Sequence, residues 1–193
     1  MKIDLNCDMG ENIGSDEDIM PYITSANIAC GFHAGDSNSM KATVRLAKKY
    51  GVSIGAHPSW KDIAGFGRRE MSLAPDEVEA LVLYQIGVLH AITKAQGIEL
   101  QHVKPHGALY NQAAKDFILA NAIVQAVKNF SGDLVLVGLA GSSLVRAGME
   151  AGLQVANEDS PTATTILMAH SFPVNRGMRS SSRQKLWRLM PSI

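Results

Sequence analysis

Residues 133–157 have the sequence DLVLVGLAGSSLVRAGMEAGLQVAN, and this stretch decides the fold class. The runs 133–140 and 153–157 are short and rich in Val and Leu, which is typical of buried β-strands. Residues 141–151 between them have helical spacing, and Gly152 separates this helix from the second run. A strand, a helix and a second strand in this order predict two parallel strands joined by a helical crossover.

The same alternation extends over most of the chain. Further strands are predicted at residues 2–8, 25–30, 52–58 and within 100–106, and further helices at 37–50, 75–96 and 114–129. The helix at 75–96 is the clearest, because its apolar residues recur at three- and four-residue spacing and Pro75 stands at its start. Six strands alternating with helices predict an α/β fold whose parallel sheet is open or closed into a (β/α) barrel.

The composition excludes several classes of protein. Lys and Arg number 18 and so do Asp and Glu, and a net charge of zero argues against a nucleic-acid-binding protein. At 193 residues a single domain is favoured. Cys7 and Cys30 are too few for a disulfide framework, and a buried thiol is favoured over a nucleophile at Cys30. Because no apolar run could cross a bilayer and no signal peptide is recognisable, a cytoplasmic location is expected.

Ionisable side chains recur at the carboxyl ends of four predicted strands. They are Asp8, His33, His57, Lys104 and His106. Since parallel strands place their carboxyl ends and the loops that follow on one rim, we expect these groups to meet in a shared active site. A single histidine of this kind would be interpreted as a core residue, but the recurrence at equivalent places favours function.

A basic loop lies between the third and fourth predicted strands. It reads Gly65-Phe66-Gly67-Arg68-Arg69, and Arg68 and Arg69 are predicted to bind phosphate or carboxylate groups. No Gly-rich stretch ends in Lys-Ser or Lys-Thr, so the sequence contains no P-loop.

Five separated motifs resemble signatures of the LamB/YcsF family. They are DLNCDMGE (4–11), NIACGFHAGD (27–36), GAHPSW (55–60), GFGRR (65–69) and HVKPHGALYN (102–111). The resemblance implies an irregular (β/α) barrel of the glycoside hydrolase/deacetylase type. It also implies opening of the lactam of 5-oxoproline to L-glutamate coupled to ATP hydrolysis, together with 5-oxoprolinase B and C subunits as partners.

The residue types suit that chemistry. A lactam carbonyl is a poor electrophile, and phosphorylating its oxygen with ATP would make attack by water feasible. Such a scheme needs a base for water, an acid and a cation for the developing negative charge. We assign Asp8 as the base, His106 as its acid/base partner and Lys104 as the cation, with His33 and His57 completing the proton path.

Two alternatives stay open. Asp8, His57 and His106 could instead hold a divalent metal ion, magnesium or zinc, because one carboxylate and two imidazoles leave positions for water and substrate. The chain would then be a metal-dependent amide or carbohydrate deacetylase on the same scaffold. Alternatively, it is a non-catalytic subunit that only binds the B and C partners.

The C-terminal segment differs in character. Residues 1–158 carry 13 basic and 17 acidic residues, whereas residues 159–193 carry five basic residues and one acid. The family resemblance also stops at Glu158, and one G inserted beside its back-translated codon restores the family's Gly-Phe-Ala-Asp-Arg. We therefore predict an incomplete barrel domain at 1–158 and a frame-shifted, non-native tail at 159–193, in preference to a genuine but divergent basic tail. A barrel truncated after about six strands would keep an unpaired sheet edge and would be inactive.

Overall fold

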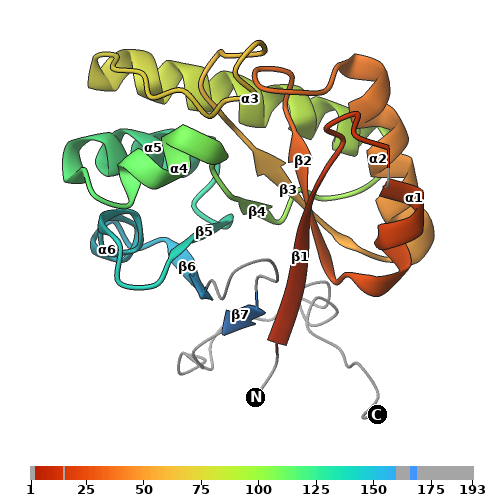
Figure 1. The fold of residues 1–193 in the computed structure, drawn as a ribbon. Helices are drawn as coiled ribbons and strands as arrows, with labels where there is room; N and C mark the ends of the chain where they lie inside the picture. The colour runs from red at the N-terminus through yellow and green to blue at the C-terminus, as the bar shows by residue number, and fades with distance from the viewer. Residues whose placement is uncertain (1–2, 15, 160–165, 169–193) are drawn as a thin grey trace.

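The computed structural model describes residues 3–14, 16–159 and 166–168. Six strands in this part of the chain form one parallel sheet, in which each strand pairs with the next in sequence (Figure 1). They are β1 (Ile3–Met9), β2 (Ser25–Ala29), β3 (Ser53–His57), β4 (His102–Val103), β5 (Val135–Leu139) and β6 (Gln154–Asp159). The predicted α/β barrel of six parallel strands is confirmed.

A seventh strand closes the ring. β7 (Ile166–Met168) lies between β6 and β1 and is antiparallel to both, with Met168 opposite Asn157 on one side and Ile3 on the other. The expectation of an unpaired edge is therefore wrong, because β7 occupies both edges. Of the segment predicted to be frame-shifted, residues 160–165 and 169–193 lie outside the described residues.

Helices lie along the top and both sides of the sheet in the view of Figure 1. They are α1 (Asp16–Ile19), the short 3₁₀ helix η1 (Met20–Tyr22), α2 (Ser37–Tyr50), α3 (Pro75–Ala95), α4 (Gly107–Ala113), α5 (Phe117–Phe130) and α6 (Ser143–Glu150). Several begin where the sequence supplies a cap. Asp36 accepts hydrogen bonds from the backbone N–H groups of Asn38 and Ser39 at 2.8 Å, which satisfies donors that the first turn of α2 leaves free.

The apolar core lies between the helices and the sheet. Ile86 and Leu89 of α3 and Ile123 and Val127 of α5 are wholly buried, and these two helices pack side by side. By length and composition alone α3 could span a membrane, a test that core helices of soluble proteins also pass. The apolar residues of α3 lie on the face that packs against α5, so they belong to the core.

The inside of the barrel is polar. Asp4 accepts hydrogen bonds from Ser25 Oγ at 2.6 Å and from Thr24 Oγ1, and both Asp4 and Ser25 are buried. His102 fits inside because Gly55 stands beside it on β3, where a Cβ atom would come 2.0 Å from His102 Nε2. Because side chains alternate along a strand, the polar face of β1 that carries Asp4 is turned into the barrel.

Cys30 follows β2 and is buried, as predicted. Its thiol donates a hydrogen bond to the Ile28 carbonyl at 3.2 Å, and burial raises the pKa of Cys30 to about 12. A thiol held in this protonated form is a poor nucleophile.

Candidate active site

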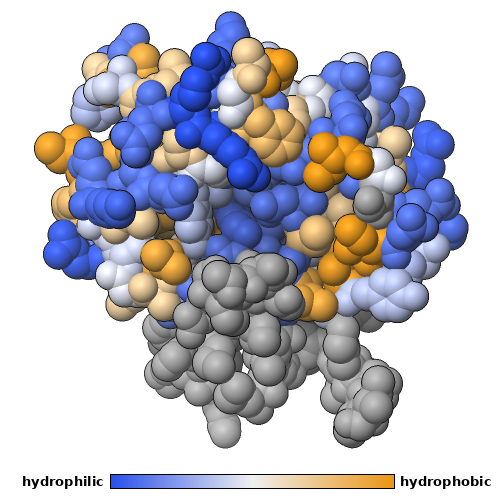
Figure 2. Space-filling model, viewed as in Figure 1, coloured by the Kyte–Doolittle hydropathy of each residue, from blue (hydrophilic) through white to orange (hydrophobic). Residues whose placement is uncertain are grey.

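A pocket of about 530 Å³ opens at the carboxyl ends of the strands. Among its lining residues are Asp8, Arg68, Lys104, Tyr110 and Glu158. Hydrophilic side chains gather at the centre of the face shown in Figure 2. The rim of a parallel barrel therefore carries the concentration of polar groups that the sequence predicts.

Lys104 stands between two carboxylates in this pocket. Its Nζ lies 2.7 Å from Glu158 Oε1 and 3.5 Å from Asp8 Oδ1, and it donates a hydrogen bond to Asn6 Oδ1 at 3.1 Å. Burial alone would lower the pKa of Lys104, but the charges of Asp8 and Glu158 outweigh burial and raise it. The ammonium group is thus held charged at the base of the pocket.

Asp8 is held in its ionised form. Burial by itself would raise the pKa of Asp8, but the charge and hydrogen bond of His57 and the Lys104 ammonium hold it well below its usual range. Asp8 Oδ2 lies 3.4 Å from His57 Nε2, and Asn27 Nδ2 donates to Asp8 Oδ1 at 2.9 Å. An ionised carboxylate of this kind can orient or deprotonate a water molecule.

Two buried residues behind the pocket fix the orientation of Asp8. His102 Nε2 donates a hydrogen bond to Asn27 Oδ1 at 2.7 Å, so the amide nitrogen of Asn27 faces Asn6 and Asp8. Burial lowers the pKa of His102 to about 3, which keeps the ring neutral. His102 and Asn27 therefore position Asp8 without lining the pocket themselves.

On the β6 side, Tyr110 and Glu158 form a second pair. The Tyr110 hydroxyl donates to Glu158 Oε2 at 2.6 Å, and burial followed by the Glu158 charge raises the pKa of Tyr110. Tyr110 therefore stays protonated as a hydrogen-bond donor.

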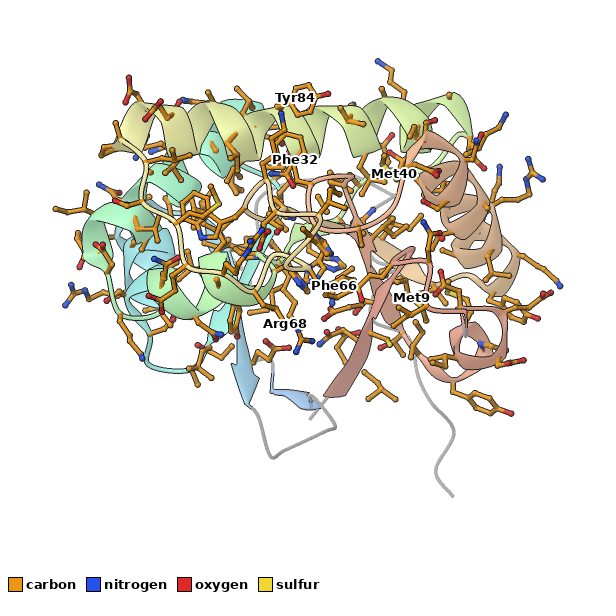
Figure 3. All side chains as sticks on the ribbon, turned by 45° about the horizontal axis from the view of Figure 1, so that its top comes forward. Met9, Phe32, Met40, Phe66, Arg68 and Tyr84 are labelled. Atoms are coloured by element: carbon orange, nitrogen blue, oxygen red, sulfur yellow. The ribbon has the colours of Figure 1, made fainter. Side chains whose placement is uncertain are left out.

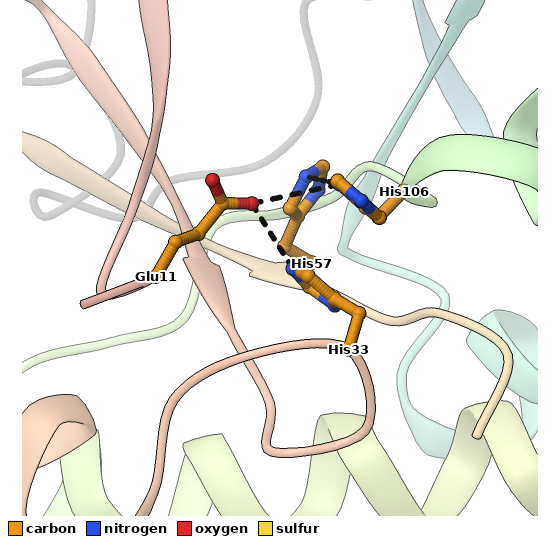
Figure 4. A group of neighbouring side chains, drawn as sticks. All are labelled: Glu11, His33, His57 and His106. Atoms are coloured by element: carbon orange, nitrogen blue, oxygen red, sulfur yellow. Dashed lines mark hydrogen bonds and ion pairs between the residues drawn. The ribbon is translucent and has the colours of Figure 1, made fainter. Parts of the chain in front are cut away.

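Three histidines and one glutamate form a compact cluster beside the pocket (Figure 4). One nitrogen or oxygen atom from each of Glu11, His33, His57 and His106 lies within 4.8 Å of the others, and all four residues are buried. His33 Nε2 is 3.0 Å from Glu11 Oε1, and the His33 ring stacks on His106 with 3.8 Å between centroids. Burial, and then the neighbouring His57 and His33, lower the pKa of His106 to about 4.

Backbone carbonyls hold two of these rings. His57 Nδ1 donates to the Lys104 carbonyl at 2.7 Å, and His106 Nε2 donates to the Phe66 carbonyl at 3.0 Å. Phe66 can reach His106 because Gly67 turns the loop with φ +65°, in a space where a Cβ atom would come 2.8 Å from His33 Cβ. Phe66 and Arg68, both on this loop, are labelled in Figure 3.

The structure brings together most of the residues that the sequence singles out. Asp8 and Lys104 meet in the pocket, and His33, His57 and His106 meet in the cluster. Of the predicted metal ligands, His57 and His106 belong to the cluster, whereas its carboxylate is Glu11 and not Asp8.

The two predicted phosphate-binding arginines separate. Arg68 lines the pocket, whereas Arg69 pairs with Asp62, outside the residues that line it. The hydrogen bond with Arg69 lowers the pKa of Asp62 to about 2. This pair closes the turn at 62–69 by joining its two ends.

Sequence reasoning missed four residues of the site: Glu11, Asn27, His102 and Glu158. Two carried a signal that could have found them. Glu11 ends the first quoted motif and lies just beyond β1, and Glu158 lies near the carboxyl end of β6. Asn27 and His102 lie on the polar faces of their strands, but this did not reveal their role, which comes from one interior hydrogen bond between different strands.

Comparisons with known proteins place the chain among close relatives. A model of the LamB/YcsF family matches residues 3–161. Several bacterial proteins named as the A subunit of 5-oxoprolinase match with high identity. That of Symbiobacterium thermophilum is 57% identical over 162 residues, covering 81% of this chain and 62% of the relative. That of Bacillus subtilis is also 57% identical over 162 residues, covering 81% and 63%.

A solved structure agrees with the fold. The crystal structure of a lactam utilization protein from Thermus thermophilus superposes with a TM-score of 0.79 at 52% identity, covering 81% of this chain and 66% of that one. The chain therefore spans slightly less than two thirds of the length of the relatives it matches.

Proposed function

The chain belongs to the LamB/YcsF family, and on this basis we propose that it is the A subunit of an ATP-dependent 5-oxoprolinase. The reaction would open the lactam of 5-oxoproline to L-glutamate with hydrolysis of ATP. It would take place in the cytoplasm, in a complex with B and C subunits. The names of the relatives support the substrate class and the existence of further subunits.

The observation that carries this proposal is the Lys104 ammonium held between Asp8 and Glu158 in a pocket at the strand ends. Opening a lactam develops negative charge on the carbonyl oxygen, and a buried cation stabilises that charge more strongly than water does. Asp8 provides an ionised carboxylate within the same contact network. A base and an oxyanion-stabilising cation are therefore present together.

The proposed reaction consumes two water molecules and one molecule of ATP. The γ-phosphoryl group of ATP passes to the lactam oxygen and ADP leaves. Water adds to the activated carbon as Asp8 takes its proton, and the C–N bond breaks as Asp8 returns that proton to the nitrogen. A second water then releases phosphate from the resulting acyl phosphate, and glutamate remains. Lys104 stabilises the oxygen charge, and Arg68 binds phosphate or carboxylate at the pocket.

A second candidate function is supported by the histidine cluster. Two imidazoles and a carboxylate at the pocket would suit a metal-dependent amide or carbohydrate deacetylase, in which a bound metal ion polarises the amide carbonyl. The two candidates differ in their requirements. Glutamate release that needs ATP supports the lactam reaction, whereas amide hydrolysis that is lost on chelation without any need for ATP supports the deacetylase.

We also propose that residues 159–193 are a frame-shifted tail and that the chain carrying it is inactive. The activity test therefore uses both this chain and a form with one base restored near codon 158, each mixed with B and C subunits. Activity is measured as glutamate released from 5-oxoproline per ATP hydrolysed.

The decisive variant is Asp8→Asn in the restored form. Loss of a catalytic base should lower the rate roughly 10²-fold or more, while the fold survives because Asp8 is not part of the apolar core. Asp76→Asn, an exposed residue on α3, is the matched control and should be fully active. Full activity in Asp8→Asn would instead mean that the chain is a non-catalytic member of the complex.

A further inference from the structure

Two ring nitrogens of the histidine cluster face each other at hydrogen-bonding distance. A carbonyl oxygen only accepts hydrogen bonds, so the ring hydrogens lie on His57 Nδ1, toward the Lys104 carbonyl, and on His106 Nε2, toward the Phe66 carbonyl. The other nitrogen of each ring therefore carries a lone pair unless that ring takes up a second proton. These two atoms, His57 Nε2 and His106 Nδ1, are 2.9 Å apart. Two acceptors at this distance repel unless a cation lies between them.

A third acceptor converges on the same point. Glu11 Oε1 lies 3.6 Å from His106 Nδ1, and the Glu11 side chain is buried (Figure 4). His33 Nε2 donates to this oxygen at 3.0 Å, and His33 Nδ1 has no partner among the described residues. Turning the His33 tautomer to free Nε2 would place an N–H at Nδ1 with no acceptor, so His33 suits the role of holding Glu11.

We propose that His57 Nε2, His106 Nδ1 and Glu11 Oε1 bind one divalent transition-metal ion of the zinc type, with His33 holding the carboxylate. A proton could bridge the two nitrogens but would leave the third acceptor unused. Two imidazoles and one carboxylate form a ligand set that zinc and its neighbours favour, whereas magnesium favours sets of oxygen ligands.

The surroundings of the three atoms also fit a metal centre. Each ligating histidine donates its second ring N–H to a backbone carbonyl, and the carboxylate accepts a hydrogen bond, which is the usual outer shell of metal ligands. His57 and His106 also line the pocket, so a bound ion would border it. Asp8, the carboxylate expected from sequence, lies 3.4 Å from His57 Nε2 and also contacts Lys104 and Asn27, so it borders the three proposed ligands.

Metal binding by the purified full chain tests this proposal without any activity measurement. After removal of adventitious metal, zinc is titrated calorimetrically and bound metal is counted by mass spectrometry. Cobalt serves as a spectroscopic probe of nitrogen and oxygen ligands. We expect one ion per chain and a rise in melting temperature with zinc. Glu11→Gln should weaken binding about 10²-fold or more, and His33→Ala about 10- to 100-fold, as for loss of an outer-shell partner.

Matched controls separate the site from surface binding. Glu99→Gln is the same change at an exposed position, and His90→Asn removes a histidine outside the cluster, so both should bind zinc as the unchanged chain does. A folded chain that binds no stoichiometric metal would overturn the proposal in favour of a bridging proton. Equal binding by Glu11→Gln and the unchanged chain would also overturn it. Neither result bears on ATP-dependent glutamate release, which is measured separately.

Discussion

At the scale of single residues, His102 couples the fold to pH. Its ring is buried inside the barrel and its pKa is lowered to about 3, whereas an unfolded histidine has a pKa near 6.5. Between these values the unfolded chain binds a proton that the folded chain does not. The free energy of unfolding therefore rises with pH across this window and falls as the solution is acidified.

The His102 contribution can be isolated by substitution. By linkage it should cost about 2 kcal/mol of stability at pH 5 relative to pH 8, since each pKa unit corresponds to about 1.4 kcal/mol. Urea unfolding at several pH values should show a shallower pH dependence for His102→Gln than for the unchanged chain. Identical slopes would contradict the assignment, because the remaining histidines are common to both proteins.

The two arginines of the 65–69 loop should behave differently. Arg68 lines the pocket, so Arg68→Ala should raise the KM for an anionic substrate about tenfold, a loss of about 1.4 kcal/mol. Arg69 pairs with Asp62, so Arg69→Ala should leave KM unchanged and loosen the 62–69 turn. Steady-state kinetics with limited proteolysis of the loop distinguishes the two effects. Equal increases in KM would show that both arginines contact substrate.

At the scale of elements, a buried glutamine on α3 anchors the loop after β3. Gln85 Oε1 accepts from the Ser59 N–H at 2.9 Å, and Gln85 Nε2 donates to the Ser59 carbonyl at 2.9 Å. Both residues are wholly buried. The loop that carries Phe66 and Arg68 therefore depends on a helix that has no contact with the pocket itself.

Gln85→Leu should destabilise the protein by about 2–5 kcal/mol. The change leaves the Ser59 N–H and carbonyl buried without partners, and each such group costs about 1–3 kcal/mol. Lys94→Leu makes a comparable polar-to-apolar change at an exposed position of the same helix and should cost little. Chemical denaturation of the two variants measures the difference, and similar midpoints would mean that the anchor is dispensable.

The elements predicted best are those with strong local signals. The helix at 37–50 is confirmed residue for residue, because Asp36 caps its start and the chain turns at Gly51. α4 was missed because it is seven residues long and His106 gives it no side-chain cap. β7 was missed because a three-residue strand has no periodicity to detect, and its place is set by pairing with β6 and β1.

The residues of the candidate site were likewise predicted only in part. The recurrence of ionisable residues at equivalent strand ends predicted that Asp8, His57 and His106 would converge. The same reasoning could not choose between Asp8 and Glu11 as the carboxylate of the cluster. That choice depends on how the chain turns after β1, which brings Glu11 Oε1 to 3.0 Å from His33 and 3.6 Å from His106, whereas Asp8 approaches His57 at 3.4 Å and turns to Lys104.

At the scale of the whole molecule, the place where the barrel closes between β6 and β1 differs in strand pairing from the rest of the ring. Three residues of β7 fill it in antiparallel pairing, whereas the other strand pairs among residues 3–159 are parallel. If residues 159–193 are frame-shifted, restoring one base near codon 158 should give a more soluble chain with a higher melting temperature. Size-exclusion chromatography and thermal melting compare the two forms, and a cooperative, equally stable and equally active unrestored chain would refute the frame-shift hypothesis.

Because Cys30 is buried, the rate at which its thiol is chemically modified reports how often the folded protein opens. A thiol-modifying reagent can reach Cys30 only when the core around β2 separates, because the side chain is 2% exposed and its hydrogen bond lies within the strand end. The rate of modification in plain buffer, divided by the rate for an unfolded chain, then gives the population of the open state when reclosing is fast. Replacing the partly exposed Cys7 by Ser leaves one reporter thiol, so stability can be followed at trace concentration, without denaturant and even in a cell lysate.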